Sequence, residues 1–189
     1  MKKSPREYVG RLQEALEHFP VDQVKTLTKV LLKAYEDGRR IFVMGNGGSA
    51  ATASHWACDI NKSCALNKDK KFRVVCLNDN VAALLAYAND ISFEDVFVGQ
   101  LKNLYIEGDV VIAISGSGNS PNVLKAIDYA RSNGALTVGL CGFTGGNLRD
   151  SVDVFVFIEV RDQQIVEDLH MTALHMCMQG ISQELGDYK

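Results

Sequence analysis

The stretch VVIAISGSGNSPNVLKAI, residues 110–127, joins three kinds of sequence in one short segment. It opens with an apolar run at residues 110–114, which together with Asp109 predicts a buried strand. The polar turn SGSGNS at residues 115–120 follows at once, and Pro121 then opens a helical pattern over residues 122–132. A buried strand that ends in three serines and two glycines at the start of a helix suggests a ligand-binding turn.

The same alternation of strand and helix continues on both sides of this stretch. Short apolar runs rich in Val and Ile predict strands at residues 40–44, 72–77, 109–114, 136–140 and 152–160. Helical patterns separate or follow them at residues 50–62, 81–88, 93–105, 122–132 and 164–185. Continuous apolar strands separated by helices predict an α/β fold with a parallel sheet covered on both faces.

Two further helices are expected before the sheet. Residues 4–19 have an apolar face and end at Pro20, and residues 21–37 end at Gly38. The chain therefore reads as a single domain over residues 1–189, with a helical pair at 1–38 and an α/β sandwich at 39–189. The helical pair is a candidate surface for oligomer formation.

Composition narrows the functional class. The 189 residues are 47% hydrophobic and 23% charged with a net charge of −3, which suits a globular protein and gives no reason to expect a nucleic-acid surface. No apolar run approaches the ~18 residues of a membrane span, and no signal peptide is recognised. The cysteines form no C-x-x-C pair, so we expect reduced thiols in a cytoplasmic protein; they are Cys58, Cys64, Cys76, Cys141 and Cys177.

Two polar turns should meet at one edge of the sheet, because the carboxyl ends of parallel strands lie together. GNGGSA at residues 45–50 follows the first predicted strand, and SGSGNS at residues 115–120 follows the third. Glycines let backbone N–H groups approach an anion, and a helix N-terminus adds partial positive charge. With the serine hydroxyls, they favour a phosphate monoester over simple helix capping by Ser117, Asn119 or Ser120.

A dinucleotide is the competing ligand for the first turn, which also fits G-x-G-x-x-A. That pattern is weak alone and requires an acidic residue about 20 positions further on. Asp79 closes the second predicted strand but lies too far along the chain, and a dinucleotide leaves the second turn unexplained. The pattern G-x-x-x-x-G-K-[ST] is absent, which argues against a nucleotide triphosphatase.

Histidines and carboxylates gather in two predicted helices. His55 and Asp59 are four residues apart and share a helix face. The last helix carries Glu167, Asp168, His170 and His175. Such a set could bind a divalent ion or move a proton next to a carbonyl, and the spacing alone does not choose between these roles.

Several motifs together resemble the sugar isomerase (SIS) domain and, more narrowly, the phosphoheptose isomerase family. They are GNGGSA, His55 with Asp59, Asn89 with Asp90, GDVVIAISGSGNSPNV and HMTALH, and the similarity covers nearly the whole chain. The resemblance implies a five-stranded parallel sheet between helices, in a flavodoxin-like three-layer arrangement. It also implies a homotetramer with active sites at subunit interfaces.

The resemblance further implies a reaction, the isomerisation of sedoheptulose 7-phosphate to D-glycero-D-manno-heptose 7-phosphate through an enediol(ate). Asp59 falls on the family's catalytic Glu and His175 on its catalytic His. His55 and Glu167 fall on positions that join those two around a zinc ion in some members. Substrate contacts fall on Asn46, Gly47, Ser49, Asp79, Ser115, Ser117, Asn119 and Ser120.

Four positions depart from the family pattern. Asp59 is one methylene shorter than Glu, and Glu167 replaces a Gln and adds negative charge. Ser63 stands in place of an Arg, and Gly116 stands where many members carry Thr. These changes leave open a related sugar phosphate as the substrate.

Two alternatives to an enzyme remain. One branch of the same family is a non-catalytic adaptor that binds a replication initiator protein, and a sugar-phosphate sensor could use the serine turns without turnover. An adaptor does not need the set His55, Asp59, Glu167 and His175, so its presence favours an isomerase.

Overall fold

A computed structural model describes residues 4–186 and contains a five-stranded sheet in which every pairing is parallel. The strands are β1 (Ile41–Gly45), β2 (Val74–Cys76), β3 (Val110–Ser115), β4 (Leu136–Gly142) and β5 (Val154–Ile158). Their order is β2-β1-β3-β4-β5, so the chain reverses direction across the sheet between β1 and β3. Ligands of such sheets bind at this reversal, beyond the carboxyl ends of the strands. The expected α/β class and parallel sheet are confirmed.

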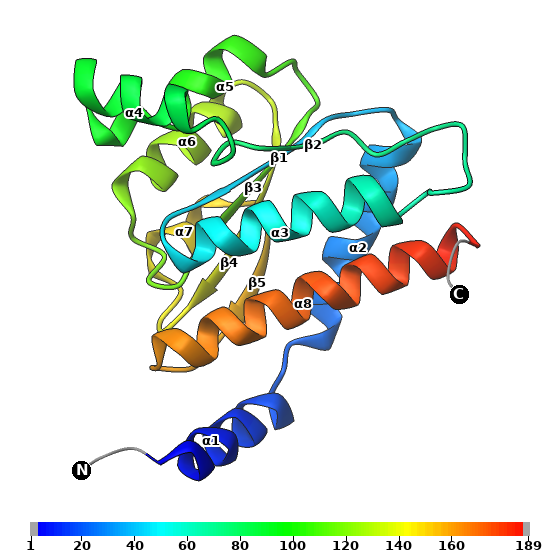
Figure 1. The fold of residues 1–189 in the computed structure, drawn as a ribbon, viewed down its shortest axis with the longest axis vertical. Coiled ribbons are helices and arrows are strands. Elements are labelled where there is room, and N and C mark those ends of the chain that lie inside the picture. Colours follow the sequence, from blue (N-terminus) through cyan, green and yellow to red (C-terminus); the bar gives the residue numbers. More distant parts are fainter. Residues whose placement is uncertain (1–3, 187–189) are drawn as a thin grey trace.

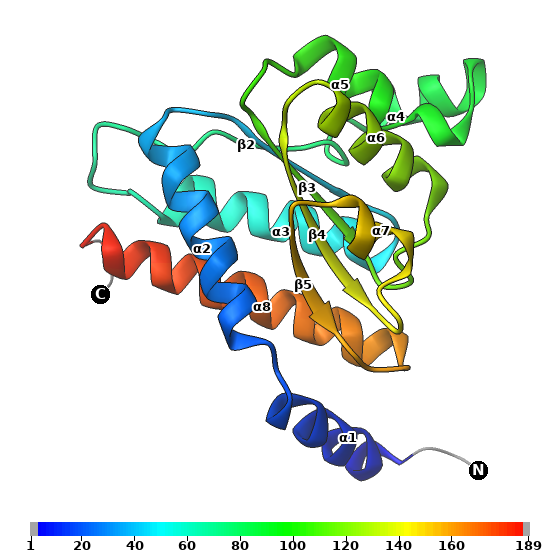
Figure 2. The ribbon, with the colours of Figure 1, turned by 180° about the vertical axis from the view of Figure 1, so that it is seen from behind.

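Helices lie on both sides of the sheet (Figure 1). One face is covered by α2 (Val21–Glu36), α3 (Gly48–Ser63) and α8 (Gln163–Glu184). The other side holds α4 (Val81–Asp90), the 3₁₀ turn η1 (Phe93–Asp95), α5 (Val98–Leu104), α6 (Pro121–Ser132) and α7 (Gly146–Ser151). Figures 1 and 2 show α1 (Pro5–Glu17) extending away from this sandwich. No helix within residues 4–186 has the length and apolar character needed to cross a membrane.

The core follows from the side-chain alternation of the strands. In β1, Ile41 and Val43 pack into the apolar cluster under α2, α3 and α8, whereas Phe42 and Met44 pack into the cluster under α5, α6 and α7. All four side chains are fully buried. A strand that is buried on both faces has to be apolar at successive positions, which explains its continuous hydrophobic sequence.

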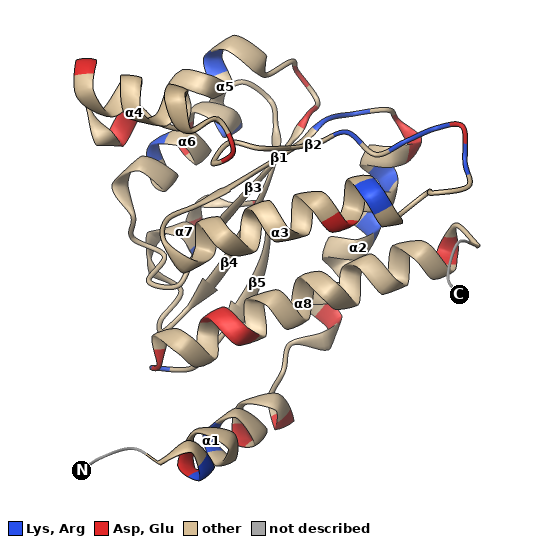
Figure 3. Ribbon diagram, viewed as in Figure 1, with Lys and Arg blue, Asp and Glu red and all other residues tan. Residues whose placement is uncertain are grey.

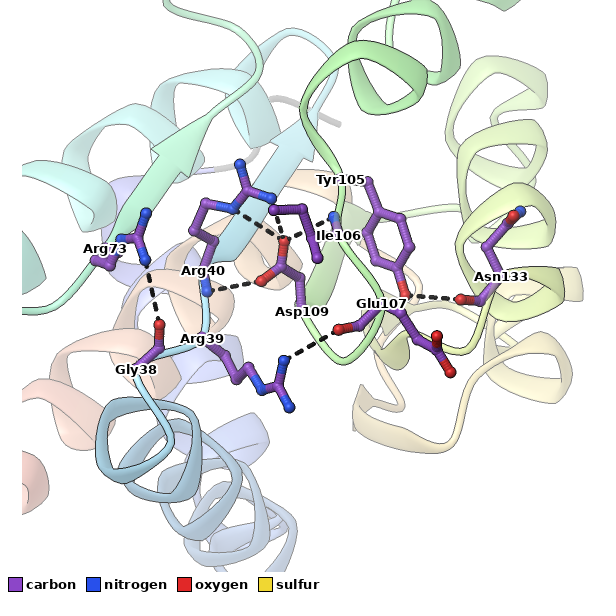
Figure 4. A network of polar contacts seen from close by, with 9 residues as sticks. All are labelled: Gly38, Arg39, Arg40, Arg73, Tyr105, Ile106, Glu107, Asp109 and Asn133. Atoms are coloured by element: carbon purple, nitrogen blue, oxygen red, sulfur yellow. Dashed lines mark hydrogen bonds and ion pairs between the residues drawn. The ribbon is translucent and has the colours of Figure 1, made fainter.

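An ion pair fixes the edge of the sheet opposite to the polar turns (Figure 4). Asp109, which is buried, accepts hydrogen bonds from the Arg40 backbone N at 2.9 Å and from Arg40 Nε at 3.0 Å. Its Oδ2 atom also lies 2.8 Å from Arg40 Nη2 and accepts a hydrogen bond from the Ile106 backbone N at 3.1 Å. This network joins the beginnings of β1 and β3.

Three local predictions are wrong. A single helix over residues 93–105 was expected, but the chain forms η1 and then α5, because Val96 and Phe97 between them turn into the core. The helix α7 was not predicted, since Gly145 and Gly146 at its start have positive φ angles and resemble a turn in the sequence. β2 and β5 are shorter than the apolar runs that predicted them.

Candidate functional site

The two polar turns meet around a small cavity at the carboxyl ends of β1 and β3. The cavity has a volume of about 160 Å³ and is lined by Asn46, Ser49, Ile114, Ser115, Gly116, Ser117, Ser120 and Gln163. Five of these eight residues are predicted substrate contacts, and they come from segments some 70 positions apart in the chain. A larger cavity of about 530 Å³ lies between α1 and the segment from β5 to α8, and no predicted site residue lines it.

The serine hydroxyls of the second turn face this cavity and do not cap a helix. Ser120 occupies the N-cap position of α6, yet its side chain makes no capping hydrogen bond. Its Oγ atom lies 3.2 Å from Oγ of the buried Ser115. Gly47, at the N-cap of α3, has no side chain with which to cap. Two helix N-termini therefore remain available to a bound anion.

The backbone of the second turn is held in place by the loop after β4. Gly118 has a φ angle of +67°, and a Cβ atom there would lie only 1.9 Å from the Gly145 carbonyl oxygen. The Gly118 carbonyl accepts a hydrogen bond from the Leu148 backbone N at 2.9 Å, and the Gly116 carbonyl accepts one from the Gly142 backbone N at 2.8 Å. The second polar turn is thus preformed, and glycine at 118 is required by the close approach.

Three predicted contacts lie at the margin of the cavity or outside it. Gly47 is exposed at the start of α3 with a φ angle of +54°. Asn119 turns toward α7, where its Oδ1 atom accepts a hydrogen bond from the Asn147 backbone N at 3.0 Å. Asp79 is exposed just beyond β2 and does not line the cavity.

Sequence reasoning missed three polar residues that build or support the site. Asn122 forms two hydrogen bonds with Asn46, at 2.8 and 2.9 Å. Asn78 holds the end of β1, since it accepts from the Gly45 backbone N at 3.1 Å and donates to the Gly45 carbonyl at 2.8 Å. Gln163 lines the cavity from the first turn of α8. Each is a single polar residue without a periodic signal of its own.

A second group of side chains lies further along α3 and α8. Asp59 Oδ2 is 3.2 Å from His55 Nε2 and 3.6 Å from His175 Nε2. The two imidazole rings are 5.2 Å apart between centroids, and one ligand atom from each of the three residues lies within 4.8 Å of the others. Asp59 and His175 are half-buried and His55 is exposed, so this His–Asp–His cluster is open to solvent and to a ligand.

The packing of α3 against α8 places this cluster relative to the cavity. The two helices run parallel, because Gly48 lies near Glu167 at one end and Cys64 lies near Ser182 at the other. Between them, buried Trp56 donates from Nε1 to the Leu174 carbonyl at 3.2 Å. At 1.5 Å per residue, His55 lies about 10 Å along α3 from its first turn. The cavity and the cluster therefore share one pair of helices.

Glu167 is separate from the cluster in this structure. Its Oε1 atom accepts a hydrogen bond from Gln163 Nε2 at 2.8 Å. The carboxylate lies against the first turn of α3, since a Cβ atom on Gly48 would be 2.5 Å from Glu167 Oε2. A helix N-terminus favours negative charge at this place. Of the four predicted metal ligands, the structure brings together His55, Asp59 and His175.

Charged donors are absent from the cavity lining. Figure 3 shows no Lys or Arg along α8 or on the first turns of α3, and none of the residues that line the cavity is a cation. Its donors are hydroxyls, amides and helix N-termini. A ligand phosphate would thus be held by neutral groups, which is the chemistry that the two turns predicted.

His170, five residues before His175 on α8, is fully buried. Burial lowers the pKa of His170 from 6.5 to about 4, although the Cys141 backbone opposes part of this effect. The ring is therefore neutral at pH 7. We assign it to the packing of α8 and not to proton transfer.

A domain family and full-length relatives both match this chain. The model of the SIS domain matches residues 6–142. The phosphoheptose isomerase of Geobacter sulfurreducens is 37% identical over 172 residues, which cover 91% of this chain and 90% of that protein. The phosphoheptose isomerase of Helicobacter pylori is 32% identical over 93% of this chain and 91% of its own length.

Solved structures agree with these relatives. The phosphoheptose isomerase of Neisseria gonorrhoeae superposes with a TM-score of 0.86 at 27% identity, covering 95% of this chain and all of that one. The phosphoheptose isomerase of Francisella tularensis has the same fold, with a TM-score of 0.87 at 22% identity over 94% of this chain and 96% of its own.

Proposed function

Because this chain belongs to the phosphoheptose isomerase family of SIS-domain proteins, we propose that it converts a ketose 7-phosphate into the corresponding aldose 7-phosphate. The proposed substrate is sedoheptulose 7-phosphate, and the proposed product is D-glycero-D-manno-heptose 7-phosphate. The names of the relatives support this choice. The observation that carries the proposal is the placement of a hydroxyl-lined cavity and a His–Asp–His cluster along the same two helices.

The phosphate end of the substrate binds in the cavity. Serine hydroxyls and backbone N–H groups at the starts of α3 and α6 donate to its oxygens. The proposed contacts are Asn46, Gly47, Ser49, Ser115, Ser117 and Ser120, with Asn119 holding the turn and Asp79 near the sugar chain. The absence of a side-chain cap on either helix supports this assignment.

The reacting carbons then lie toward the cluster, where Asp59 acts as the general base. Its carboxylate removes a proton from C1 of the ketose while His175 donates a proton to the carbonyl oxygen on C2, which gives a 1,2-enediol. His175 then takes the proton of the O1 hydroxyl and Asp59 gives its proton to C2, which leaves an aldehyde at C1 and restores both residues. Positioned acids and bases of this kind contribute roughly 10²–10⁴-fold each to a rate.

A divalent cation fits the same cluster. Two imidazole nitrogens and one carboxylate oxygen within 4.8 Å of one another form a donor set that suits zinc and leaves positions for substrate oxygens. We propose His55, Asp59 and His175 as its ligands, while Glu167, the fourth residue predicted as a ligand, stays paired with Gln163. When bound, the ion would stabilise negative charge on the substrate oxygens in place of the proton from His175.

We also propose a homotetramer with active sites at subunit interfaces. α1 has no buried residue and exposes Val9 and Leu16, and α4 has none and exposes Val81 and Leu85. Exposed apolar side chains on helices that are only partly covered by the sandwich are typical of subunit interfaces. The five free cysteines are consistent with a cytoplasmic location.

The proposal is tested by supplying ketose phosphates of five to seven carbons and following aldose formation. We expect turnover to be greatest on the seven-carbon substrate, and Asp59→Asn and His175→Ala to lower kcat by at least ~10²-fold with an unchanged circular dichroism spectrum. Asp128→Asn, on the exposed face of α6, is the matched control and keeps full activity. Tight binding of the sugar phosphate without any turnover would instead identify a sensor, and binding of an initiator protein without turnover would identify an adaptor.

A further inference from the structure

Gln163 and Gly116 face each other across the cavity, although neither is a catalytic candidate. Gln163 is the first residue of α8, and both residues line the cavity. A Cβ atom on Gly116 would lie 2.7 Å from both Nε2 and Oε1 of Gln163. The amide group therefore occupies the space into which any larger side chain at position 116 would project.

The backbone of the turn cannot retreat to make room for both side chains. The Gly116 carbonyl accepts the hydrogen bond from the Gly142 backbone N at 2.8 Å, and it lies 3.1 Å from where a Cβ on Gly142 would be. Gln163 is instead the flexible member of the pair. A side chain at 116 would thus displace the amide of Gln163 and leave the fold intact.

The orientation of the amide is fixed from the other side. Gln163 Nε2 donates one N–H to Glu167 Oε1 at 2.8 Å, and a carboxylate can only accept, so the NH₂ group must face Glu167. An amide nitrogen carries two N–H donors, and the structure gives a partner to one of them. Gln163 lines the cavity, whereas Glu167 does not.

We propose that Gln163 is a substrate-positioning residue that donates its second N–H to the phosphate of the substrate, and that glycine at 116 is what admits it. This inference deepens the proposed function and rests on it. The same contact keeps the carboxylate of Glu167 paired and turned away from the phosphate. Hydrogen bonds to charged groups are worth enough to change affinity by roughly 10- to 100-fold.

The test measures binding of inorganic phosphate by calorimetry, together with kcat and KM on the sugar phosphate. We expect Gln163→Ala to raise the Kd for phosphate and the KM by ~10-fold or more, with kcat changed by less than about threefold. Gln163→Glu keeps the size but replaces the donor by a charge, and should weaken phosphate binding further. Gln183→Ala, an exposed glutamine at the other end of α8, is the control and should match the wild type.

A double-mutant cycle with Gly116→Thr tests the pairing itself. Gly116→Thr alone should weaken phosphate binding about as much as Gln163→Ala, because both remove the amide from the cavity. In the Gln163→Ala background, Gly116→Thr should cause no further loss, since its hydroxyl enters the vacated space. A Kd for Gln163→Ala within twofold of wild type, or simple additivity of the two losses, overturns the proposal.

The isomerase function and the role of Gln163 can be tested separately. If Gln163→Ala weakens phosphate binding as expected but the wild type shows no isomerase activity, the role of Gln163 is supported and the proposed function is wrong. If the wild type is an active isomerase but Gln163→Ala has an unchanged KM, the proposed function is supported and the role of Gln163 is wrong. Unchanged circular dichroism spectra and melting temperatures exclude misfolding as the cause of either result.

Discussion

The side-chain amides of Asn46 and Asn122 form a reciprocal pair, each donating to the other, at 2.8 and 2.9 Å. Asn46 belongs to the first polar turn, and Asn122 lies buried in the first turn of α6. The Asn122 Oδ1 atom also accepts a hydrogen bond from the Val123 backbone N at 3.0 Å. The two turns that line the cavity are thus joined by one amide pair.

Loss of this pair should separate the two turns. We expect Asn122→Ala to lower the free energy of unfolding by about 1–3 kcal/mol, because Asn46 and the Val123 backbone N lose their buried partner. The KM for the sugar phosphate should rise as well. Denaturant unfolding and steady-state kinetics measure the two effects, and Asn103→Ala on the exposed side of α5 serves as the control. A variant that equals the control in both measurements contradicts this role.

The His–Asp–His cluster predicts a response to chelators. Elemental analysis of the purified protein should find about one divalent ion per chain, as expected for a single site with three protein ligands. Removal of the ion by a chelator should lower kcat, and added zinc should restore it. His55→Ala should lose the ion, whereas His18→Ala, at an exposed position just after α1, should keep it. Full activity in protein shown to contain no metal would rule out the proposed ion.

Buried His170 predicts a loss of stability in acid. Its pKa is lowered from 6.5 to about 4 by burial, so the unfolded chain binds a proton between these pH values and the folded chain does not. The free energy of unfolding is unaffected above pH 6.5 and falls by up to about 1.4 kcal/mol per pH unit as the pH drops toward 4.

Variants separate this contribution from the titration of other groups. His170→Gln should flatten the dependence of unfolding free energy on pH between 6.5 and 4, even if it changes the value at pH 7. His18→Gln, in which an exposed histidine is replaced, should keep the slope of the wild type. If unfolding free energy depends on pH with the same slope in all three proteins, burial does not lower the pKa of His170.

The ion pair of Arg40 and Asp109 predicts a loss of stability without a loss of function. Asp109→Asn leaves the half-buried Arg40 without its counter-charge, and breaking a fully buried pair in this way costs about 3–5 kcal/mol, so we expect a loss of a few kcal/mol at most. Because the pair lies at the sheet edge opposite to the cavity, the Kd for phosphate of the folded variant should stay within twofold of wild type. Asp128→Asn on the surface should change the unfolding free energy by less than about 0.5 kcal/mol. A weakened phosphate affinity in Asp109→Asn would show that the two edges are coupled.

The strands beside the site and the place where its two turns meet could be predicted to a large extent from local sequence. β1 and β3 are apolar at successive positions because both of their faces are buried, and the polar turns after them stand out by contrast. The parallel arrangement then brings the turns together at one edge without any knowledge of side-chain contacts.

The partners that complete the site could not be predicted in this way. Asn78, Asn122 and Gln163 are single polar residues, and their contacts with Gly45, Asn46 and Glu167 depend on how the strands and helices pack. The same limit applies to Asn119, whose sequence context suggests a ligand contact but whose side chain bonds to the start of α7. Local patterns locate a turn, whereas packing decides which of its side chains point inward.

The parallel run of α3 and α8 has a consequence for the choice between sugars. The two helices are joined by buried contacts such as that of Trp56 with Leu174, so the distance from the cavity to the His–Asp–His cluster is fixed. A sugar whose phosphate is bound in the cavity must be long enough for its carbonyl end to reach the cluster. We expect ketose phosphates with shorter carbon chains to bind without reaching Asp59. The fixed spacing of the two helices therefore selects substrates by chain length.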